Sequence, residues 1–135
     1  MAPRVTVVIT QRERMSLTER SLESILADCS EPFALIYVNG GSPASVRDYL
    51  VRRASEAGFR LIRREDWLWP NVARNMSLEF VGTPYVVFID NDVLVEPGWL
   101  GRLVAAADET GAVRLPGIPL HAGAHGVCQK FGRTG

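Results

Sequence analysis

Two aspartates, Asp90 and Asp92, directly follow a run of five apolar residues, Tyr85 to Ile89. Because side chains alternate along an extended backbone, both carboxylates would share one face at the end of a strand. Carboxylates placed in this way can hold a divalent cation such as Mg²⁺ against a substrate diphosphate, since the ion completes its shell with phosphate oxygens. The pair therefore suggests nucleotide or sugar-nucleotide chemistry.

The same residues can be interpreted as a polar turn where a buried strand leaves the sheet, because Asp and Asn are common turn residues. A calcium loop of the EF-hand type fits poorly, since Val93-Leu94-Val95 occupies positions where that loop needs oxygen ligands and a glycine. A phosphotransferase of the haloacid dehalogenase type also fits poorly, because its aspartates normally follow the first strand and Asp90 follows the fourth. Spacing alone leaves the metal site and the turn open.

Length and composition indicate one soluble domain. A chain of 135 residues with 47% hydrophobic content can bury one core but hardly two, so we expect a single domain over 1–135, with 111–135 as a candidate flexible tail. Fifteen basic and fifteen acidic side chains cancel, which argues against nucleic acid or an anionic membrane as partner. Cys29 and Cys128 are expected to be free, buried thiols and not a disulfide framework, as in a reducing cytoplasm. No apolar run suggests a signal peptide or a membrane span, and we expect a cytoplasmic protein.

Strand patterns alternate with helix patterns along the chain. Strands are expected at 5–10, 33–38, about 59–62 and 85–89, and the intervening segments have helical periodicity. The first helix should begin with a capping box at Ser16, and the other helices should begin at Pro43, Pro70 and Pro97. Gly58 should end the second helix, residues 63–66 should form a charged turn, and Val72 should face inward with Ala73 and Met76.

This alternation predicts right-handed crossovers and a mainly parallel sheet covered by helices on both faces. Ligands of such sheets bind beyond the carboxyl ends of the strands. Three polar clusters, at 10–14, 39–42 and 90–92, follow predicted strand ends. We therefore expect them to line one crevice, which favours the metal-site interpretation of the aspartates.

Several segments of the chain, taken in order, resemble a known family. They are Val5–Thr10 with Ser21–Leu26, then Asn71-Val72-Ala73-Arg74-Asn75, and finally Phe88-Ile89-Asp90-Asn91-Asp92 followed by Glu96-Pro97-Gly98-Trp99-Leu100. This order is similar to that in the nucleotide-binding half of inverting glycosyltransferases of family 2, which have the GT-A fold. The resemblance covers about residues 5–103. It implies a Rossmann-type three-layer α/β/α sandwich that the end of the chain cuts short.

Carried over by position, the resemblance implies that Thr10 and Arg12 lie beside the nucleotide. Asn39 stands where the family usually has an aspartate that contacts the base or ribose. Arg74 would face the diphosphate.

In the last of these segments, the resemblance places Asp90 toward the ribose or sugar of the donor, with Asn91 in the same nucleotide-sugar site. Asp92 would ligate Mn²⁺ or Mg²⁺, which stabilises the diphosphate leaving group. The implied reaction is transfer of a sugar from a nucleoside-diphosphate donor to the hydroxyl of an unknown acceptor, with inversion.

The chain departs from the family pattern at two places. Asn39-Gly40-Gly41-Ser42 replaces the usual Asp-Asp-Gly-Ser, so acidic contacts to the nucleoside are missing. Trp67-Leu68-Trp69-Pro70 replaces a glycine-containing approach to the Ala-Arg-Asn helix. These tryptophans could stack on a nucleobase or fill a hydrophobic corner, and we favour packing because large aromatic residues usually serve cores.

An inverting enzyme also needs a base, normally a carboxylate, and no Asp or Glu follows Glu109. The alternative to an enzyme is therefore a non-catalytic nucleotide-sugar-binding or interaction module, formed by a truncated or degenerate domain. A sheet edge exposed by truncation could also promote homo-oligomers.

His121, His125 and Cys128 form only a weak zinc pattern, although one histidine could instead complete the shell of the donor metal. Arg63 and Arg64 are expected to form a solvated charged face, with phosphate binding as the alternative.

Overall fold

The computed structural model describes residues 2–11, 15–110, 119–120, 124–125 and 127–130. Its centre is a five-stranded sheet in the order β3-β2-β1-β4-β7. Four strands are parallel, namely β1 (Val5–Thr10), β2 (Phe33–Gly40), β3 (Arg60–Arg64) and β4 (Tyr85–Asp90). The edge strand β7 (Val127–Lys130) pairs antiparallel with β4. Two short strands, β5 (Pro119–Leu120) and β6 (Ala124–His125), pair separately.

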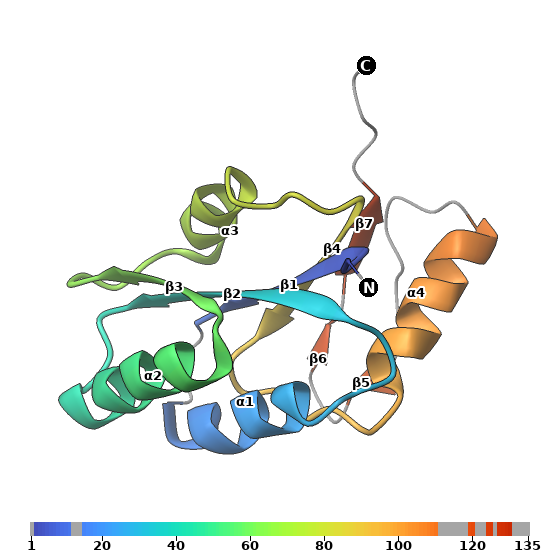
Figure 1. Ribbon diagram of the computed structural model, residues 1–135. Coiled ribbons are helices and arrows are strands. Elements are labelled where there is room, and N and C mark those ends of the chain that lie inside the picture. The colour runs from blue at the N-terminus through green and yellow to red at the C-terminus, as the bar shows by residue number, and fades with distance from the viewer. Residues whose placement is uncertain (1, 12–14, 111–118, 121–123, 126, 131–135) are drawn as a thin grey trace.

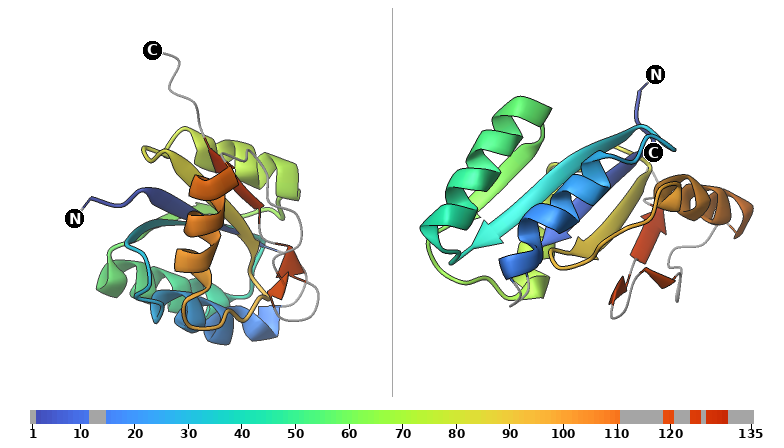
Figure 2. Two further views of the ribbon diagram at one scale, coloured as in Figure 1. Left: turned by 90° about the vertical axis from the view of Figure 1, so that its right-hand side faces the viewer. Right: turned by 90° about the horizontal axis from the view of Figure 1, so that it is seen from below.

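Helices cover both faces of the sheet (Figure 1). A 3₁₀ turn, η1 (Met15–Leu17), leads into α1 (Thr18–Leu26), which lies beside α2 (Ala44–Ala57) on one face, as Figure 2 shows from below. Helix α3 (Pro70–Leu78) covers the other face, and α4 (Trp99–Thr110) packs with the core under α1 and α2. The expected three-layer α/β/α sandwich is confirmed. No helix in the described part of the chain is long and apolar enough to cross a membrane.

The core has one part on each side of the sheet. Every residue of β1 and β4 is buried, which explains why these strands read as nearly continuous apolar runs. The larger cluster joins the sheet to α1, α2 and α4 and includes Val7, Ile9, Leu22, Ile25, Leu35, Tyr37, Leu50, Ile89, Leu100 and Leu103. The smaller cluster lies under α3 and contains Val8, Ile36, Val38, Ala73, Val86 and Phe88.

Two helix boundaries follow the sequence signals. Gly58 ends α2 in the left-handed conformation, with φ of 77°, and Pro70 is the first residue of α3. The predicted start of the second helix at Pro43 is one residue early, because Pro43 is the N-cap and α2 begins at Ala44. Pro97 lies in a turn with Gly98, whose φ is 87°, so α4 begins only at Trp99.

The predicted capping box is wrong. Ser16 lies within η1, and the N-cap of α1 is Leu17, which makes no side-chain capping bond. The 3₁₀ turn leads directly into α1, so its backbone replaces a capping side chain as the start of the helix.

The predicted charged turn at 63–66 is wrong in its first half. Arg63 and Arg64 belong to β3, because their backbone pairs with Asn39 and Gly40 of β2. As β3 is the outer strand on that side, its arginines can reach solvent and protect the edge from pairing with other chains. Val72 is also not inward, since 46% of it is exposed.

The loop between β3 and α3 lies directly on the end of β2. A Cβ at Gly40 would stand 2.5 Å from the carbonyl oxygen of Asp66 and 2.8 Å from Cγ of Leu68. At Gly41, whose φ is 66°, a Cβ would stand 2.9 Å from the backbone nitrogen of Trp67. Two glycines are therefore needed where the two loops meet.

Hydrogen bonds to the side chain of Asp28 link the segment that follows α1 to the start of α4. Its buried carboxylate accepts hydrogen bonds from the backbone N–H groups of Gly98 and Leu100, both at 3.2 Å. It also accepts from the backbone and hydroxyl of Ser30, at 3.0 and 2.9 Å. Burial by itself raises the pKa of Asp28, but these hydrogen bonds lower it, and the net direction is down.

We expect Gly40→Ala to lower the free energy of unfolding by about 2 kcal/mol, because the new methyl group overlaps the backbone of the β3–α3 loop. Urea unfolding measures this loss. Gly82→Ala is the matched control, since a Cβ there meets nothing within 4 Å, and its effect should be near zero. Equal effects of the two substitutions would show that the loop does not press on β2.

We also expect Asp28→Asn to destabilise the protein at neutral pH by about 1–3 kcal/mol, because an amide cannot replace all four accepted bonds. A lowered pKa means that the stabilisation is present above the ordinary pKa of Asp, about 3.9, and is lost as the pH falls through the folded-state value. The difference between wild type and variant should therefore shrink in acid. Asp48→Asn, which changes an exposed carboxylate on α2, should show a small difference at every pH.

Candidate functional site

Three polar segments meet at the carboxyl edge of the parallel sheet. Thr10, the last residue of β1, is in register with Val38 of β2 on one side and with Asp90 of β4 on the other. The residues that follow these strands therefore gather at one edge, and the expected convergence is confirmed for 10–11, 39–42 and 90–92. Arg12 lies outside the described residues.

Thr10, Asp90 and Arg74 lie on the α3 side of this edge. Alternation along the strands places Thr10 on the same face as Val8, and Asp90 on the same face as Phe88, and both apolar residues belong to the cluster under α3. The guanidinium carbon of Arg74 stands 5.6 Å from the centre of the Phe88 ring. The structure thus brings a hydroxyl, a carboxylate and a cation toward the same end of the sheet.

Asn91 faces the opposite way. Its backbone N–H donates to the carbonyl of Thr10 at 3.0 Å, and its side-chain amide donates to the hydroxyl of Thr18 on α1 at 3.3 Å. Only 1% of the residue is exposed. These bonds hold the segment after β4 against α1, and a contact of Asn91 with a ligand stays a prediction.

Asp92 lies in a turn and not on the strand. The backbone N–H of Val93 donates to the carbonyl of Asp90 at 3.4 Å, so the alternation that would put both carboxylates on one face ends at Asp90. The turn interpretation is correct for the backbone, which does not exclude a metal site. Asp92 is half-buried and makes no ion pair within the described part of the chain.

Gln11 organises the β2 side of the edge. Its Oε1 accepts hydrogen bonds from Nδ2 of Asn39 at 2.6 Å and from the backbone N–H of Gly40 at 3.0 Å. Oδ1 of Asn39 in turn accepts from the hydroxyl of Ser42 at 2.8 Å. Sequence reasoning placed Gln11 in a polar cluster without giving it a role, because its partners are 28 and 29 residues away.

Buried polar atoms without partners concentrate at this edge. Among the described residues, they are Oγ1 of Thr10, Nε2 of Gln11, Nε of Arg63, Nε of Arg74 and, away from the edge, Nε1 of Trp99. Arg63 belongs here because it is in register with Asn39. Buried polar groups in proteins are nearly always hydrogen-bonded, so a cluster of unpaired ones marks a place where ordered water or a polar ligand can bind.

Two aromatic side chains stand beside the same loops. Trp67 is 44% exposed and Trp69 is 69% exposed, and their rings meet edge to face with centres 4.7 Å apart. The prediction that they fill a hydrophobic corner is therefore wrong. Leu68, between them, is the residue that packs against the core. Stacking of a tryptophan on a nucleobase stays a prediction.

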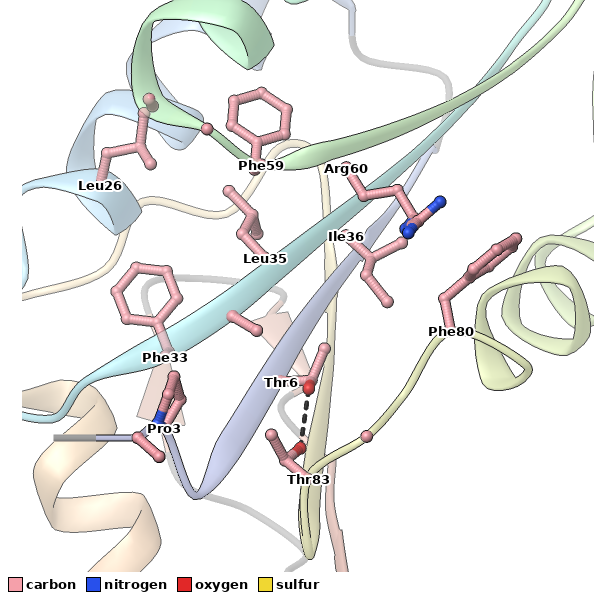
Figure 3. A pocket seen from close by; sticks show the side chains of 15 residues that line it. Pro3, Thr6, Leu26, Phe33, Leu35, Ile36, Phe59, Arg60, Phe80 and Thr83 are labelled. Atoms are coloured by element: carbon pink, nitrogen blue, oxygen red, sulfur yellow. Dashed lines mark hydrogen bonds between the residues drawn. The ribbon is translucent and has the colours of Figure 1, made fainter.

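The carboxyl edge is distinct from an apolar groove of about 580 Å³ around the amino-terminal half of β2. Phe33, Phe59 and Phe80 line this groove, and its hydroxyls of Thr6 and Thr83 bond to each other at 2.7 Å (Figure 3). The two threonine hydroxyls of this groove are thus paired, and the guanidinium of Arg60, which also lines it, lies over the ring of Phe80.

No group of three or more His, Cys, Asp or Glu side chains that could hold a metal ion is found among the described residues. Asp90, at the end of β4, and Asp92, in the turn that follows, are therefore two carboxylates close in sequence and not part of a larger acidic group among the described residues. Such a pair fits a Mg²⁺-type ion that takes its remaining ligands from water and from the phosphates of a substrate. The side chains of His121, His125 and Cys128 lie outside what the structure describes. Cys29 is a free thiol but is exposed, so the expectation that it is buried is wrong.

The family model for glycosyl transferase family 2 matches residues 6–127. An uncharacterized glycosyltransferase of Rickettsia bellii (strain RML369-C) is 26% identical over 91 residues, which are 67% of this chain and 13% of that protein.

Solved structures show the same fold. S. aureus TarS 1-349 in complex with UDP has a TM-score of 0.71 and 18% identity, and the match covers 86% of this chain and 38% of that one. The mannosyltransferase PcManGT from Pyrobaculum calidifontis, in complex with GDP-Man and Mn²⁺, has a TM-score of 0.72 and 18% identity over 96% of this chain and 45% of that one. The chain thus spans less than half the length of these relatives. Its sandwich is the GT-A fold, and the chain belongs to glycosyltransferase family 2.

Proposed function

We propose that this domain binds a nucleoside-diphosphate sugar together with Mn²⁺ or Mg²⁺ at the carboxyl edge of its sheet. In the whole protein, the bound donor would transfer its sugar to an acceptor hydroxyl with inversion. The observation that carries the proposal is the set of unpaired buried polar atoms beside Asp90 and Asp92. Family membership supports it, as do structural relatives that hold UDP or GDP-Man with Mn²⁺.

Each side of the edge suits a different part of such a donor. On the α3 side, Arg74 offers an N–H group without a partner in the described chain, and a guanidinium forms strong, charge-assisted bonds with phosphate oxygens. The unpaired hydroxyl of Thr10 lies on the same side and can donate to a phosphate or accept from a ribose hydroxyl. This is the charged end of the proposed site.

Asp92 and Asp90 would hold the metal. Asp92 is the stronger candidate, because its carboxylate is half-buried and no cation of the described chain pairs with it. When bound, the ion would offset the charge of the diphosphate and make it a better leaving group. The protein's part is to hold the carboxylates and Arg74 in place around the diphosphate.

Donor binding is common to a transferring enzyme and to a module that only binds the nucleotide sugar. It is therefore the property to test on this chain. A transferring enzyme also consumes the donor in the presence of an acceptor, whereas a binding module leaves it intact.

We expect titration calorimetry to show that the chain binds one of UDP, GDP or dTDP when Mn²⁺ is present. Asp92→Ala should weaken this binding at least about tenfold, because it removes a metal ligand. Asp92 lies outside the core, so the thermal unfolding temperature should be nearly unchanged.

Asp48→Ala removes an exposed carboxylate of α2 and should bind like the wild type. Equal binding by Asp92→Ala and wild type would contradict the metal assignment. A loss of stability without a loss of affinity would assign Asp92 to the turn alone.

A further inference from the structure

We propose that Gln11 selects the base of the nucleotide donor. Its side-chain N–H would donate to the carbonyl oxygen at C4 of a pyrimidine or C6 of a purine, the position where cytosine and adenine carry an amino group. The domain would therefore prefer the keto bases uracil, thymine and guanine to the amino bases cytosine and adenine. The inference rests on the proposed function, because it concerns the same site.

The orientation of the Gln11 amide is fixed by its neighbours. The backbone N–H of Gly40 can only donate, so the Gln11 atom that faces it at 3.0 Å must be the oxygen. The same oxygen accepts from Asn39 at 2.6 Å. A turned amide would set its NH₂ group against the N–H of Gly40, and Nε2 is therefore held on the far side of the amide from both partners.

Nε2 of Gln11 is a buried donor without an acceptor in the described chain. Only 4% of Gln11 is exposed. Leaving such a group unpaired is unfavourable, and a ligand oxygen at this position would supply the missing acceptor. A carbonyl oxygen accepts this bond, whereas an exocyclic amino group would place a donor against a donor.

Asn39 also helps to hold the Gln11 amide in place. Its Nδ2 donates to Gln11 while its Oδ1 accepts from Ser42. A carboxylate at position 39 would set an acceptor against Oε1 of Gln11 and remove one of the two bonds that hold the amide. The amide of Asn39 thus reinforces the orientation that Gly40 sets, in which Gln11 presents a donor.

Apart from Arg63, which is in register with Asn39, the polar side chains of this part of the edge are uncharged, which favours the base over the phosphates as their partner. Gln11, Asn39 and Ser42 carry amides and a hydroxyl, while Arg74 and Asp90 lie on the opposite face of the sheet. The backbone of Trp67, whose ring is 44% exposed, lies against Gly41 in the same loop. Polar amides beside an exposed aromatic ring are suited to a planar base, which needs edge contacts and a stacking surface.

The test compares bases that share a ring system and differ at the keto or amino position. The affinities of UDP and CDP, and of GDP and ADP, are measured by calorimetry with Mn²⁺ for the wild type and for Gln11→Glu. In Gln11→Glu, one carboxylate oxygen can keep both bonds to Gly40 and Asn39, and the other replaces the donor by an acceptor. The wild type should bind the keto member of the pair that includes the preferred nucleotide about tenfold more tightly, and the variant should abolish or invert that ratio.

The ratio, and not the absolute affinity, is the readout, because an added negative charge weakens the binding of every diphosphate. Ser45→Asp adds the same charge at an exposed position of α2 close to Ser42, and it should leave the ratio unchanged. Gln11→Met, which has neither donor nor acceptor, should abolish the ratio without adding charge. It provides the comparison if Gln11→Glu does not fold, as judged by circular dichroism.

Each outcome decides the inference. A keto preference that is lost or inverted in the Gln11 variants supports it. Nucleotide binding with no keto preference, or with a preference that the folded Gln11 variants retain, overturns it and leaves the proposed function standing. Absence of binding by these four nucleotides and by dTDP overturns the proposed function, and the inference about Gln11 with it.

Discussion

The register of β1 between β2 and β4 is the constraint on which the site depends. Thr10 is paired with Val38 and Asp90, so the three strands end at nearly the same level. A slip of one residue would turn every buried side chain of β1 to the other face, which the two apolar clusters do not permit. The hydrophobic effect thus sets the register, and the register brings Gln11, Asn39 and Asp90 to one edge.

Burial explains how much of the structure could be predicted from the sequence. The strands at the centre of the sheet are nearly continuous apolar runs bounded by polar residues, and the sequence predicts β1 with its correct ends at Val5 and Thr10. The pairing of β7 with β4 was not foreseen, because Val127–Lys130 is a short segment with no marked pattern of its own. Arg63 and Arg64 were missed as strand residues because backbone pairing with β2, and not their side chains, extends β3.

The same difference between local sequence patterns and long-range contacts applies to the site. Residue types and the order of strands were enough to indicate Thr10, Asn39, Arg74 and the aspartates, since each is next to a strand end or within a recognisable helix. The role of Gln11 depends on contacts across 28 and 29 residues, which spacing along the chain cannot show. The exposure of Trp67 and Trp69 likewise depends on a long-range contact. Their loop packs closely against Gly40 and Gly41, and in this arrangement Leu68, between the two tryptophans, packs against the core.

The loop that carries Asp92 is held from outside the site. Oγ of Ser21 on α1 donates to the carbonyl of Val93, and Oγ of Ser24 accepts from the backbone N–H of Val95 at 3.2 Å. Asp28 then binds the start of α4. A metal ligand needs a fixed position but also access to the ion, and burying Asp92 itself would oppose its charge. Because α1 fixes the backbone on the C-terminal side of Asp92, the carboxylate can remain half-buried while its position is still defined.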